Sequence, residues 1–216
     1  MKTIIIIPCH NEEKNISKVV FDSLKYSPHV LVVDDGSTDK TPQNAKESGA
    51  TILKHIINLG KGAAAKTGCD YAYEKGFDSV ILIDGDGQHD PCEIPRFVEQ
   101  LNQADIVFGY RKFSKNMPFV FRFGNQLINL VTKVLYGLNL KDTQNGYRAF
   151  KVNIYRKIRW KAQDYSMESE MIANVGRYKL NHKEVPIQTI YSDNYKGTTI
   201  IDGIKIVLNM FLWRLN

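Results

Sequence analysis

The first 110 residues alternate short aliphatic runs with segments of helical periodicity, and this alternation constrains the fold more than any other feature. The aliphatic runs are continuous, which is typical of strands buried on both faces of a mostly parallel sheet. Strands that alternate with helices indicate an α/β fold, with helices on both faces of the sheet. We expect strands in TIIIIP (3–8), HVLVVDD (29–35), ATILKHI (50–56), SVILID (79–84) and ADIVFGYR (104–111).

The segments between these runs carry helix signals. Ile16, Val19, Val20 and Leu24 recur at helical spacing, and later segments are opened by proline or closed by glycine. We therefore expect helices within 12–26, 38–49, 62–76 and 91–103.

Polar and glycine-rich residues follow each of the five runs. In doubly wound sheets ligands bind beyond the carboxyl ends of the strands, where these loops would meet. One such loop alone is typical of an ordinary turn, but five on one edge indicate a binding site. The loops are PCHNEE (8–13), DDGSTD (34–39), NLGKG (58–62), DGDGQHD (84–90) and GYR (109–111).

The fourth loop places Asp84 and Asp86 one residue apart at the end of a buried run. Two like charges there repel each other unless a cation lies between them. Carboxylate oxygens favour Mg²⁺ or Mn²⁺, and the amide oxygen of Gln88 is a candidate third ligand. Mg²⁺ usually takes its remaining ligands from substrate phosphates. Gly85 and Gly87 would let the backbone approach a ligand closely.

The second loop offers two readings of its polar residues. Asp35 stands where nucleotide-binding α/β folds place an acid against a ribose or base. Ser37 or Thr38 would cap the following helix by accepting from its free N–H groups. We expect both, with Asp35 as the ligand.

The stretch GKGAAAKT (60–67) nearly matches a phosphate-binding P-loop, but Ala65 replaces its second glycine. An alanine run of this kind favours plain helix. We therefore expect Lys61, flanked by Gly60 and Gly62, to lie on a loop over a nucleotide or sugar. His10 and His89 have no visible partner, so neither is favoured as an acid or base.

Charge is distributed unevenly along the chain. Residues 1–110 hold 11 Lys and Arg against 16 Asp and Glu, a net charge of −5, whereas residues 111–216 hold 18 against 7, a net charge of +11. The basic half indicates an anionic partner such as a membrane surface, a phosphate or a nucleic acid. Nucleic acid is the least favoured, because this half shows no recognisable binding motif or aromatic stacking module.

Two segments of the basic half are strongly apolar, at 117–136 and 198–216. In the second, Asp202, Lys205, Asn209 and Asn216 share one narrow helical face, and apolar residues cover most of the rest. An ordinary core-packing helix is the simpler alternative, but so wide an apolar arc favours a membrane-interface helix. Neither segment contains an uninterrupted apolar run of about 18 residues, which a membrane span requires.

The N-terminal run of four isoleucines is too short for a signal peptide and is followed at once by polar residues, so a buried strand is expected. Three scattered cysteines indicate free thiols in a reducing compartment. We expect a cytoplasmic protein attached peripherally to the cytoplasmic face of the membrane.

With these loops placed, the chain resembles family 2 glycosyltransferases of the GT-A fold, in the branch of dolichyl-phosphate mannose synthases and related polyprenyl-phosphate sugar transferases. The resemblance implies a Rossmann-like, mostly parallel sheet with C-terminal interface helices. It also implies inverting transfer of a sugar from a GDP- or UDP-sugar to polyprenyl phosphate, with Mg²⁺ or Mn²⁺. The matching segments are IIPCHNE (6–12), VVDDGSTD (32–39), NLGKGAA (58–64), LIDGDGQHDP (82–91), GYR (109–111) and DTQNGYRAF (142–150).

The resemblance also implies residue roles. Asp84, Gly85 and Asp86 would bind the nucleotide sugar, and Asp84, Asp86 and Gln88 the metal. Arg111 would face the donor diphosphate or the acceptor phosphate. Arg122 and Arg148 would lie near the acceptor phosphate, so that Asp86 and these three arginines form the predicted catalytic set. The residues implied to hold the nucleoside are Pro8, Asn11, Glu12 and Asp35.

The same resemblance divides the chain into a donor-binding half, 1–112, and an acceptor-binding half with interface helices, 113–216, within one catalytic domain. The chain departs from the family pattern before its last helix. There SDNYKGTTI stands in place of a Gly-x-Ser-Lys segment, and Lys196 is a candidate for the missing charge. Many relatives also carry a long C-terminal transmembrane region. This chain has one amphipathic segment there instead, so we expect a minimal, peripheral form of the family.

Two alternatives remain open at this point. A family 2 transferase that acts on a glycan or another hydroxyl acceptor would need a general base, for which Asp142, Glu168 or Glu170 is a candidate. A non-catalytic, membrane-associated nucleotide-binding module is the alternative from another class, although the intact acidic pair and Arg111 count against it.

Overall fold

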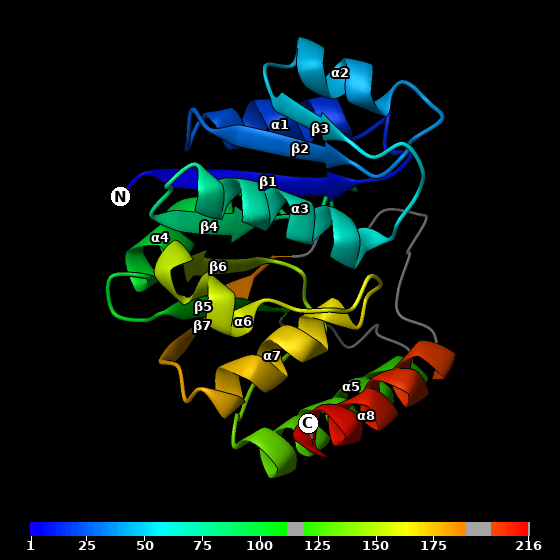
Figure 1. Cartoon of the computed structure of the whole chain (residues 1–216), viewed down its shortest axis with the longest axis vertical. Coiled ribbons are helices and arrows are strands. Elements are labelled where there is room, and N and C mark those ends of the chain that lie inside the picture. The colour runs from blue at the N-terminus through cyan, green and yellow to red at the C-terminus, as the bar shows by residue number, and fades with distance from the viewer. Residues whose placement is uncertain (112–118, 189–199, 216) are drawn as a thin grey trace.

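The computed structural model describes residues 1–111, 119–188 and 200–215 (Figure 1). One seven-stranded sheet runs through it in the order β3-β2-β1-β4-β6-β5-β7. Every neighbouring pair is parallel except the two that involve β6, so the prediction of a mostly parallel α/β sheet is confirmed. The strands are β1 (Thr3–Cys9), β2 (Val30–Asp34), β3 (Thr51–Lys54), β4 (Ser79–Leu82), β5 (Ile106–Arg111), β6 (Arg148–Lys151) and β7 (His182–Ile187).

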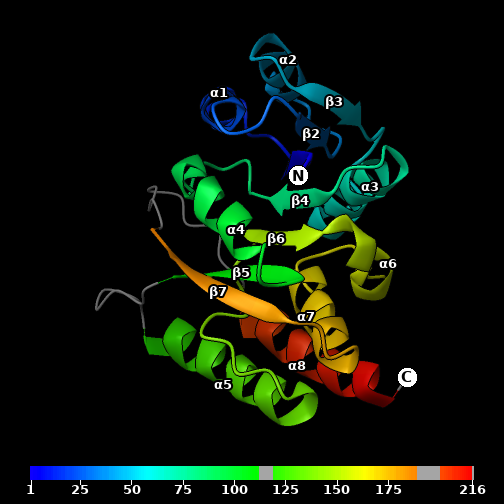
Figure 2. The ribbon, with the colours of Figure 1, turned by 90° about the vertical axis from the view of Figure 1, so that its left-hand side faces the viewer.

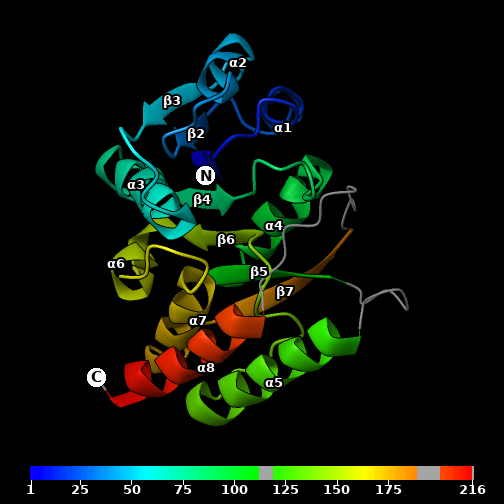
Figure 3. The same ribbon diagram turned by 90° about the vertical axis from the view of Figure 1, so that its right-hand side faces the viewer.

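Helices cover both faces of the sheet (Figures 2 and 3). One core cluster joins the sheet to α3, α6 and α7, and a second joins its other face to α1, α2 and α4. Within the described residues, no helix is long and apolar enough to cross a membrane. The helices are α1 (Ile16–Leu24), α2 (Thr41–Glu47), α3 (Lys61–Glu74), α4 (Ile94–Gln100), α5 (Phe119–Tyr136), α6 (Tyr155–Ile158), α7 (Met167–Arg177) and α8 (Ile200–Leu215), with short 3₁₀ turns at Pro91–Glu93 and Val152–Ile154.

Strand β6 decides which loops meet at the binding edge. It lies between β4 and β5 and runs antiparallel to both, with Arg148 beside Leu82 on one side and Phe108 on the other. Its first residue therefore lies at the carboxyl ends of its neighbours. As a consequence the preceding loop, residues 142–147, enters the same edge as the loops after the parallel strands.

Helices α5 and α8 pack side by side and against α7, and they lie beyond the β7 end of the sheet (Figure 3). Their inner faces meet in a small cluster that contains Ile128, Tyr136 and Met210, and Tyr136 Oη donates to the carbonyl of Met210. One side of the C-terminal helix is thus ordinary core structure. Other apolar side chains on the two helices are exposed, namely Leu127, Leu130, Val134, Leu208, Phe211 and Leu212.

Candidate active site

A lysine and two carboxylates form the centre of the candidate site. Asp84 follows β4, Lys61 opens α3 and Glu168 lies in the first turn of α7. Lys61 Nζ is 2.8 Å from Asp84 Oδ1 and 3.0 Å from Glu168 Oε1. Burial alone would raise the pKa of Asp84, but the attraction of Lys61 outweighs it and lowers that pKa. Burial opposes the charge on Lys61, yet the attraction of the two carboxylates outweighs it and raises the pKa of Lys61, so this side chain is protonated at neutral pH.

Asp86 carries the negative charge that this cluster does not neutralise. Burial, and then the repulsion of Asp84, raise the pKa of Asp86 to about 6. Asp86 Oδ1 also accepts from the backbone N–H of Gln88 at 2.9 Å, which bends the loop after β4 into a tight turn. A raised carboxylate pKa marks a place where a cation would be stabilising.

The residues after β4 fit a divalent cation. Asp84 and Asp86 supply carboxylate oxygens, Gln88 an amide oxygen, and all three are only partly buried. Among the residues that the structure describes, no group of three or more His, Cys, Asp and Glu side chains is arranged to hold a metal. A cation bound here would therefore rely on two carboxylates together with oxygens from a ligand, as Mg²⁺ does in phosphate-binding sites.

His89 lies under the acidic turn and is not a proton-transfer group at neutral pH. Burial lowers its pKa to about 4, which outweighs the attraction of Asp84. The N–H of Asp84 donates to Nδ1 of His89 at 3.3 Å, and the His89 ring lies tilted against that of Tyr147, with the ring centroids 5.3 Å apart. His89 is thus a neutral packing group that accepts a bond from the Asp84 backbone.

Asn11 ties the first two loops together. It adopts a left-handed conformation with φ of 54°. Its N–H donates to Ser37 Oγ at 2.9 Å, and its side-chain oxygen accepts from the N–H of Thr38 at 3.0 Å. The prediction that Ser37 or Thr38 caps the next helix is wrong, because α2 begins only at Thr41 with Lys40 at its N-cap position. The N–H of Thr41 donates instead to Asp39 Oδ1 at 2.9 Å.

Asp35 is buried and organises the loop before α3. Its Oδ1 accepts from Leu59 N at 2.9 Å and faces His55 Nδ1 at 2.7 Å, and its Oδ2 accepts from Gly60 N at 2.8 Å. The structure therefore gives Asp35 a clear positioning role, and direct contact with a nucleoside stays a prediction. Of the other residues predicted to hold the nucleoside, Pro8 is buried in β1, and the N–H of Glu12 donates to Thr41 Oγ1.

The turn that carries Lys61 is held by a segment far away in the sequence. Gly60 has φ of 97°, and a side chain there would collide with the carbonyl of Gln163. That carbonyl accepts from Gly62 N at 2.7 Å, while Trp160 Nε1 donates to the carbonyl of Gly62 at 2.8 Å. The alanine run forms regular helix, as predicted, but the loop predicted for Lys61 ends at Gly60, because Lys61 and Gly62 are already the first two residues of α3.

Gly146, in the loop before β6, covers the ion pair. A Cβ at this position would lie 2.8 Å from Asp84 Oδ2 and 3.0 Å from Lys61 Nζ. An alanine here would have to displace the ends of these two side chains, which pair with each other.

The three predicted arginines differ in their surroundings. Arg111 pairs with buried Asp142 through two bonds, from Nε to Oδ2 at 2.7 Å and from Nη2 to Oδ1 at 3.1 Å. Arg148 is fully buried, and its guanidinium donates to the backbone carbonyls of Thr143, Asn145 and Glu168. Arg122 belongs to α5, but its side chain, like the whole of Lys196, lies outside the described part of the structure.

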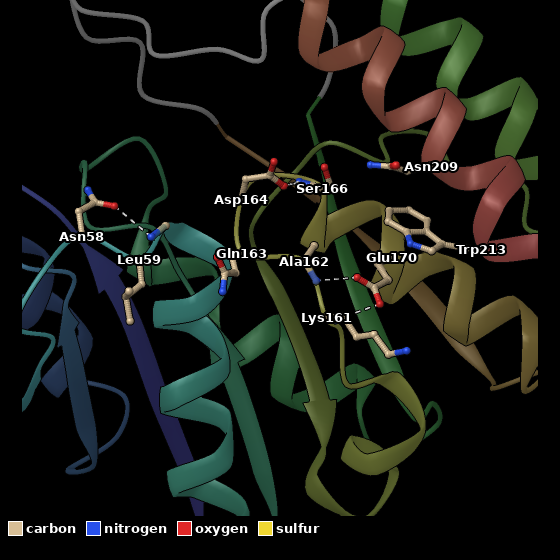
Figure 4. Close-up of a pocket in the computed structure, with 11 residues that line it drawn as sticks. Asn58, Leu59, Lys161, Ala162, Gln163, Asp164, Ser166, Glu170, Asn209 and Trp213 are labelled. Carbon is tan, nitrogen blue, oxygen red and sulfur yellow. Dashed lines mark hydrogen bonds between the residues drawn. The ribbon is translucent and has the colours of Figure 1, made fainter. Parts of the chain in front are cut away.

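A cavity of about 690 Å³ lies beside the Lys61 turn (Figure 4). It is bounded by the loop before α3, the segment before α7, and α8, from which Asn209 and Trp213 point into it. Glu170 on its wall accepts from the N–H groups of Lys161 and Ala162. Sequence patterns did not indicate that residues 160–166 would border the site, because these residues match no motif and approach it only through the fold.

A mostly parallel α/β sheet with an acidic pair and a glycine-bounded lysine at its carboxyl edge defines a candidate nucleotide-dependent transferase. The family model described as Glycosyl transferase family 2 matches residues 4–159. The chain therefore belongs to glycosyltransferase family 2.

Similar proteins span nearly the whole chain. UDP-N-acetylglucosamine–dolichyl-phosphate N-acetylglucosaminyltransferase of Methanococcus voltae is 32% identical, over 98% of this chain and 95% of that protein. Undecaprenyl-phosphate mannosyltransferase of Micrococcus luteus is 29% identical, over 100% of this chain and 95% of that protein. Among solved structures, glucosyl-3-phosphoglycerate synthase of Mycobacterium tuberculosis, in complex with Mn²⁺, UDP and phosphoglyceric acid, matches with a TM-score of 0.76 at 21% identity, over 99% of this chain and 78% of that one. This likeness shows the GT-A fold.

Proposed function

We propose that this protein transfers a sugar from a nucleotide diphosphate sugar to a polyprenyl phosphate, with inversion at the anomeric carbon. The proposal rests on one observation: each candidate general base already has an ion-pair or hydrogen-bond partner. Asp142 is paired with Arg111, Glu168 with Lys61, and Glu170 accepts two backbone N–H groups. The named relatives of Methanococcus voltae and Micrococcus luteus, which act on dolichyl and undecaprenyl phosphates, support the same acceptor class.

A phosphate acceptor removes the need for a general base. The second pKa of a phosphomonoester is about 6, so its oxygen is already largely ionised at neutral pH. That oxygen attacks the anomeric carbon, and the bond from this carbon to the donor diphosphate breaks with the electron pair leaving on the diphosphate. Neutral His89 has no proton to take in this scheme.

The leaving diphosphate must be neutralised. Asp84, Asp86 and Gln88 would hold Mg²⁺ or Mn²⁺, which supplies charge stabilisation on the diphosphate when bound. Asn11 and Glu12, beside buried Pro8 and Asp35, would line the nucleoside pocket. Gly85 packs against Cys9 at the end of β1, which brings the acidic turn close to that pocket.

The arginines would act on the phosphates by two routes. Arg111, fixed in direction by Asp142, would face the donor diphosphate or the acceptor phosphate. Arg122 on α5 would meet the acceptor phosphate. Arg148 serves as a positioning residue in this proposal, because its guanidinium is occupied by backbone carbonyls below the loop.

We assign donor binding to residues 1–112 and acceptor binding to residues 113–216, with α5 and α8 lying on the cytoplasmic membrane surface. The exposed apolar side chains of these helices are accompanied by the exposed cations Lys133, Lys205 and Arg214. Apolar contacts with flanking positive charge favour an anionic lipid surface.

The membrane assignment is tested by vesicle co-sedimentation. Replacing Leu208, Phe211 and Leu212 by Gln should release the protein from vesicles that contain anionic lipid, with the melting temperature preserved because these side chains are exposed. The matched control is Phe21→Gln, which removes an exposed aromatic side chain from α1. Equal vesicle binding by the triple variant and the wild type would refute this part of the proposal.

The catalytic assignment is tested by incubating radiolabelled UDP- and GDP-sugars with polyprenyl phosphate and Mg²⁺ or Mn²⁺. We expect label in the organic phase. No transfer from any common donor would refute the lipid-phosphate proposal. The hypothesis of a non-catalytic, membrane-associated nucleotide-binding module would then be favoured. Because Asp142 orients Arg111 and Glu168 holds Lys61, loss of transfer in Asp142→Asn or Glu168→Gln alone does not indicate a base. If either variant loses the acidic limb of the wild-type pH–rate profile while nucleotide and metal binding persist, a base is required and a hydroxyl acceptor is favoured instead.

A further inference from the structure

The ammonium of Lys61 stands next to the first carboxylate of the proposed cation site. It bridges Asp84, from the donor half, and Glu168, from the acceptor half, at 2.8 and 3.0 Å. A positive charge at that distance offsets the negative charge that would attract a metal ion. In the protein without donor, Lys61 and a divalent cation thus compete for the same carboxylate.

The backbone around Lys61 is held by hydrogen bonds. Lys61 can therefore exchange one carboxylate partner for another only by rotating its side chain. The N–H of Gly60 donates to Asp35 Oδ2, and that of Gly62 donates to the Gln163 carbonyl. Trp160 Nε1 donates to the carbonyl of Gly62. The four-carbon stem of lysine rotates freely compared with such a turn.

Glu168 offers a second place for the ammonium. Its side chain is 4% exposed, and Oε2 is buried without a hydrogen-bond partner, whereas Oε1 already contacts Lys61. Its backbone carbonyl is held by Arg148 at 2.7 Å. Glu168 is therefore a fixed anchor with one unused acceptor, on which Lys61 can remain paired after leaving Asp84.

We propose that Lys61 is an internal counter-cation that holds Asp84 while the donor is absent and shifts toward Glu168 when the donor diphosphate arrives with its metal. The inference rests on the proposed role of Asp84 as a metal ligand. Metal alone binds weakly because Lys61 opposes it. The nucleotide relieves this opposition because its negative phosphates strengthen the hold on the metal at Asp84, and the ammonium then stays on Glu168. Metal and nucleotide consequently bind with positive coupling, which is reciprocal by thermodynamic linkage.

The test is a Mn²⁺ titration followed by electron paramagnetic resonance, without sugar or acceptor. We expect Lys61→Met to bind Mn²⁺ about tenfold more tightly than the wild type. The matched control is Lys66→Met, which removes the same charge from the same helix and should leave the affinity within about twofold. UDP, with GDP in parallel, should tighten Mn²⁺ binding much more in the wild type than in Lys61→Met.

A second pair of variants separates this effect from misfolding. Lys61→Met leaves Glu168 buried without its cation, so the double variant with Glu168→Gln restores a neutral pair, and melting temperatures in EDTA check that both fold. The double variant should also bind Mn²⁺ more tightly than the wild type. Glu168→Gln alone should bind it about threefold more weakly, because Lys61 then has Asp84 as its remaining carboxylate partner in the cluster.

Mn²⁺ affinities of Lys61→Met and the double variant that are equal to or weaker than that of the wild type would overturn the inference. So would the same tightening in Lys66→Met. Because the titration contains no sugar or acceptor, its failure leaves the proposed transferase activity untouched. Absence of sugar transfer with the expected affinities would count against the proposed function alone.

Discussion

Replacing Arg148 by Met tests whether this arginine is a scaffold residue or a phosphate ligand. Its guanidinium donates to the carbonyls of Glu168 at 2.7 Å, Thr143 at 3.0 Å and Asn145 at 3.1 Å. Burial lowers the pKa of Arg148 to about 10, so it remains charged at neutral pH. Methionine would fill much of the volume but remove the donors that Arg148 supplies to these three carbonyls.

The expected loss of stability follows from these bonds. Each bond to a charged group contributes about 1.5–3 kcal/mol, and the relieved cost of burying the charge offsets part of the sum. We expect a net loss of about 3–5 kcal/mol in the free energy of unfolding, which lowers the melting temperature by roughly 10 °C in a domain of this size. The matched control is Arg159→Met, which breaks a half-exposed pair with Asp70 and should cost about 1 kcal/mol or less.

Urea unfolding and differential scanning calorimetry would measure both variants, and transfer assays below the melting temperature would measure activity. A scaffold role predicts a large stability loss, with activity falling as the 142–147 loop and the first turn of α7 loosen. If Arg148→Met keeps the wild-type melting temperature within about 2 °C and loses transfer, Arg148 is a direct phosphate ligand and the reasoning is refuted.

Three further predictions follow from the same site. Because the folded-state pKa of Asp86 is raised to about 6, its contribution to stability is full below pH 4 and is lost as pH rises through 6. In EDTA, Asp86→Asn should therefore be more stable than the wild type at pH 7 by about 1–3 kcal/mol but not at pH 4, and equal urea midpoints at pH 7 would contradict this. His89→Gln should retain the wild-type pH dependence of transfer between pH 6 and 8, since His89 is neutral there; a lost limb in the pH–rate profile would show that it titrates in the reaction. Gly146→Ala should weaken binding of the metal–nucleotide complex at least about tenfold in calorimetric titrations, because its Cβ would press on Asp84 and Lys61; unchanged affinity would mean that the loop can withdraw.

The sequence alone predicted the strands, helices and strand-end loops whose signal lies in a few consecutive residues. Aliphatic runs gave the first five strands, and the alanine run of 63–65 predicted helix instead of a P-loop. Polar residues at the ends of those strands predicted the binding edge and its acidic pair. These inferences hold because strand and helix periodicity are local, and parallel strands bring their carboxyl ends together. The helix cap assigned to Ser37 or Thr38 was wrong because the helix begins only at Thr41, where Asp39 accepts its first N–H, and helix ends are the least locally encoded part of an element.

Only the tertiary structure decided how the charges are paired. The antiparallel insertion of β6 buries Arg148 and brings Gly146 over Asp84, and the fold brings the first turn of α7 to the start of α3, where Glu168 pairs with Lys61. The sequence singled out Arg148 and Glu168 as candidates, but it did not indicate that Arg148 is buried against backbone carbonyls or that Glu168 pairs with Lys61. The physical reason is that an ion pair between distant segments depends on the burial and direction of both side chains, which the register of the sheet sets and no local pattern encodes.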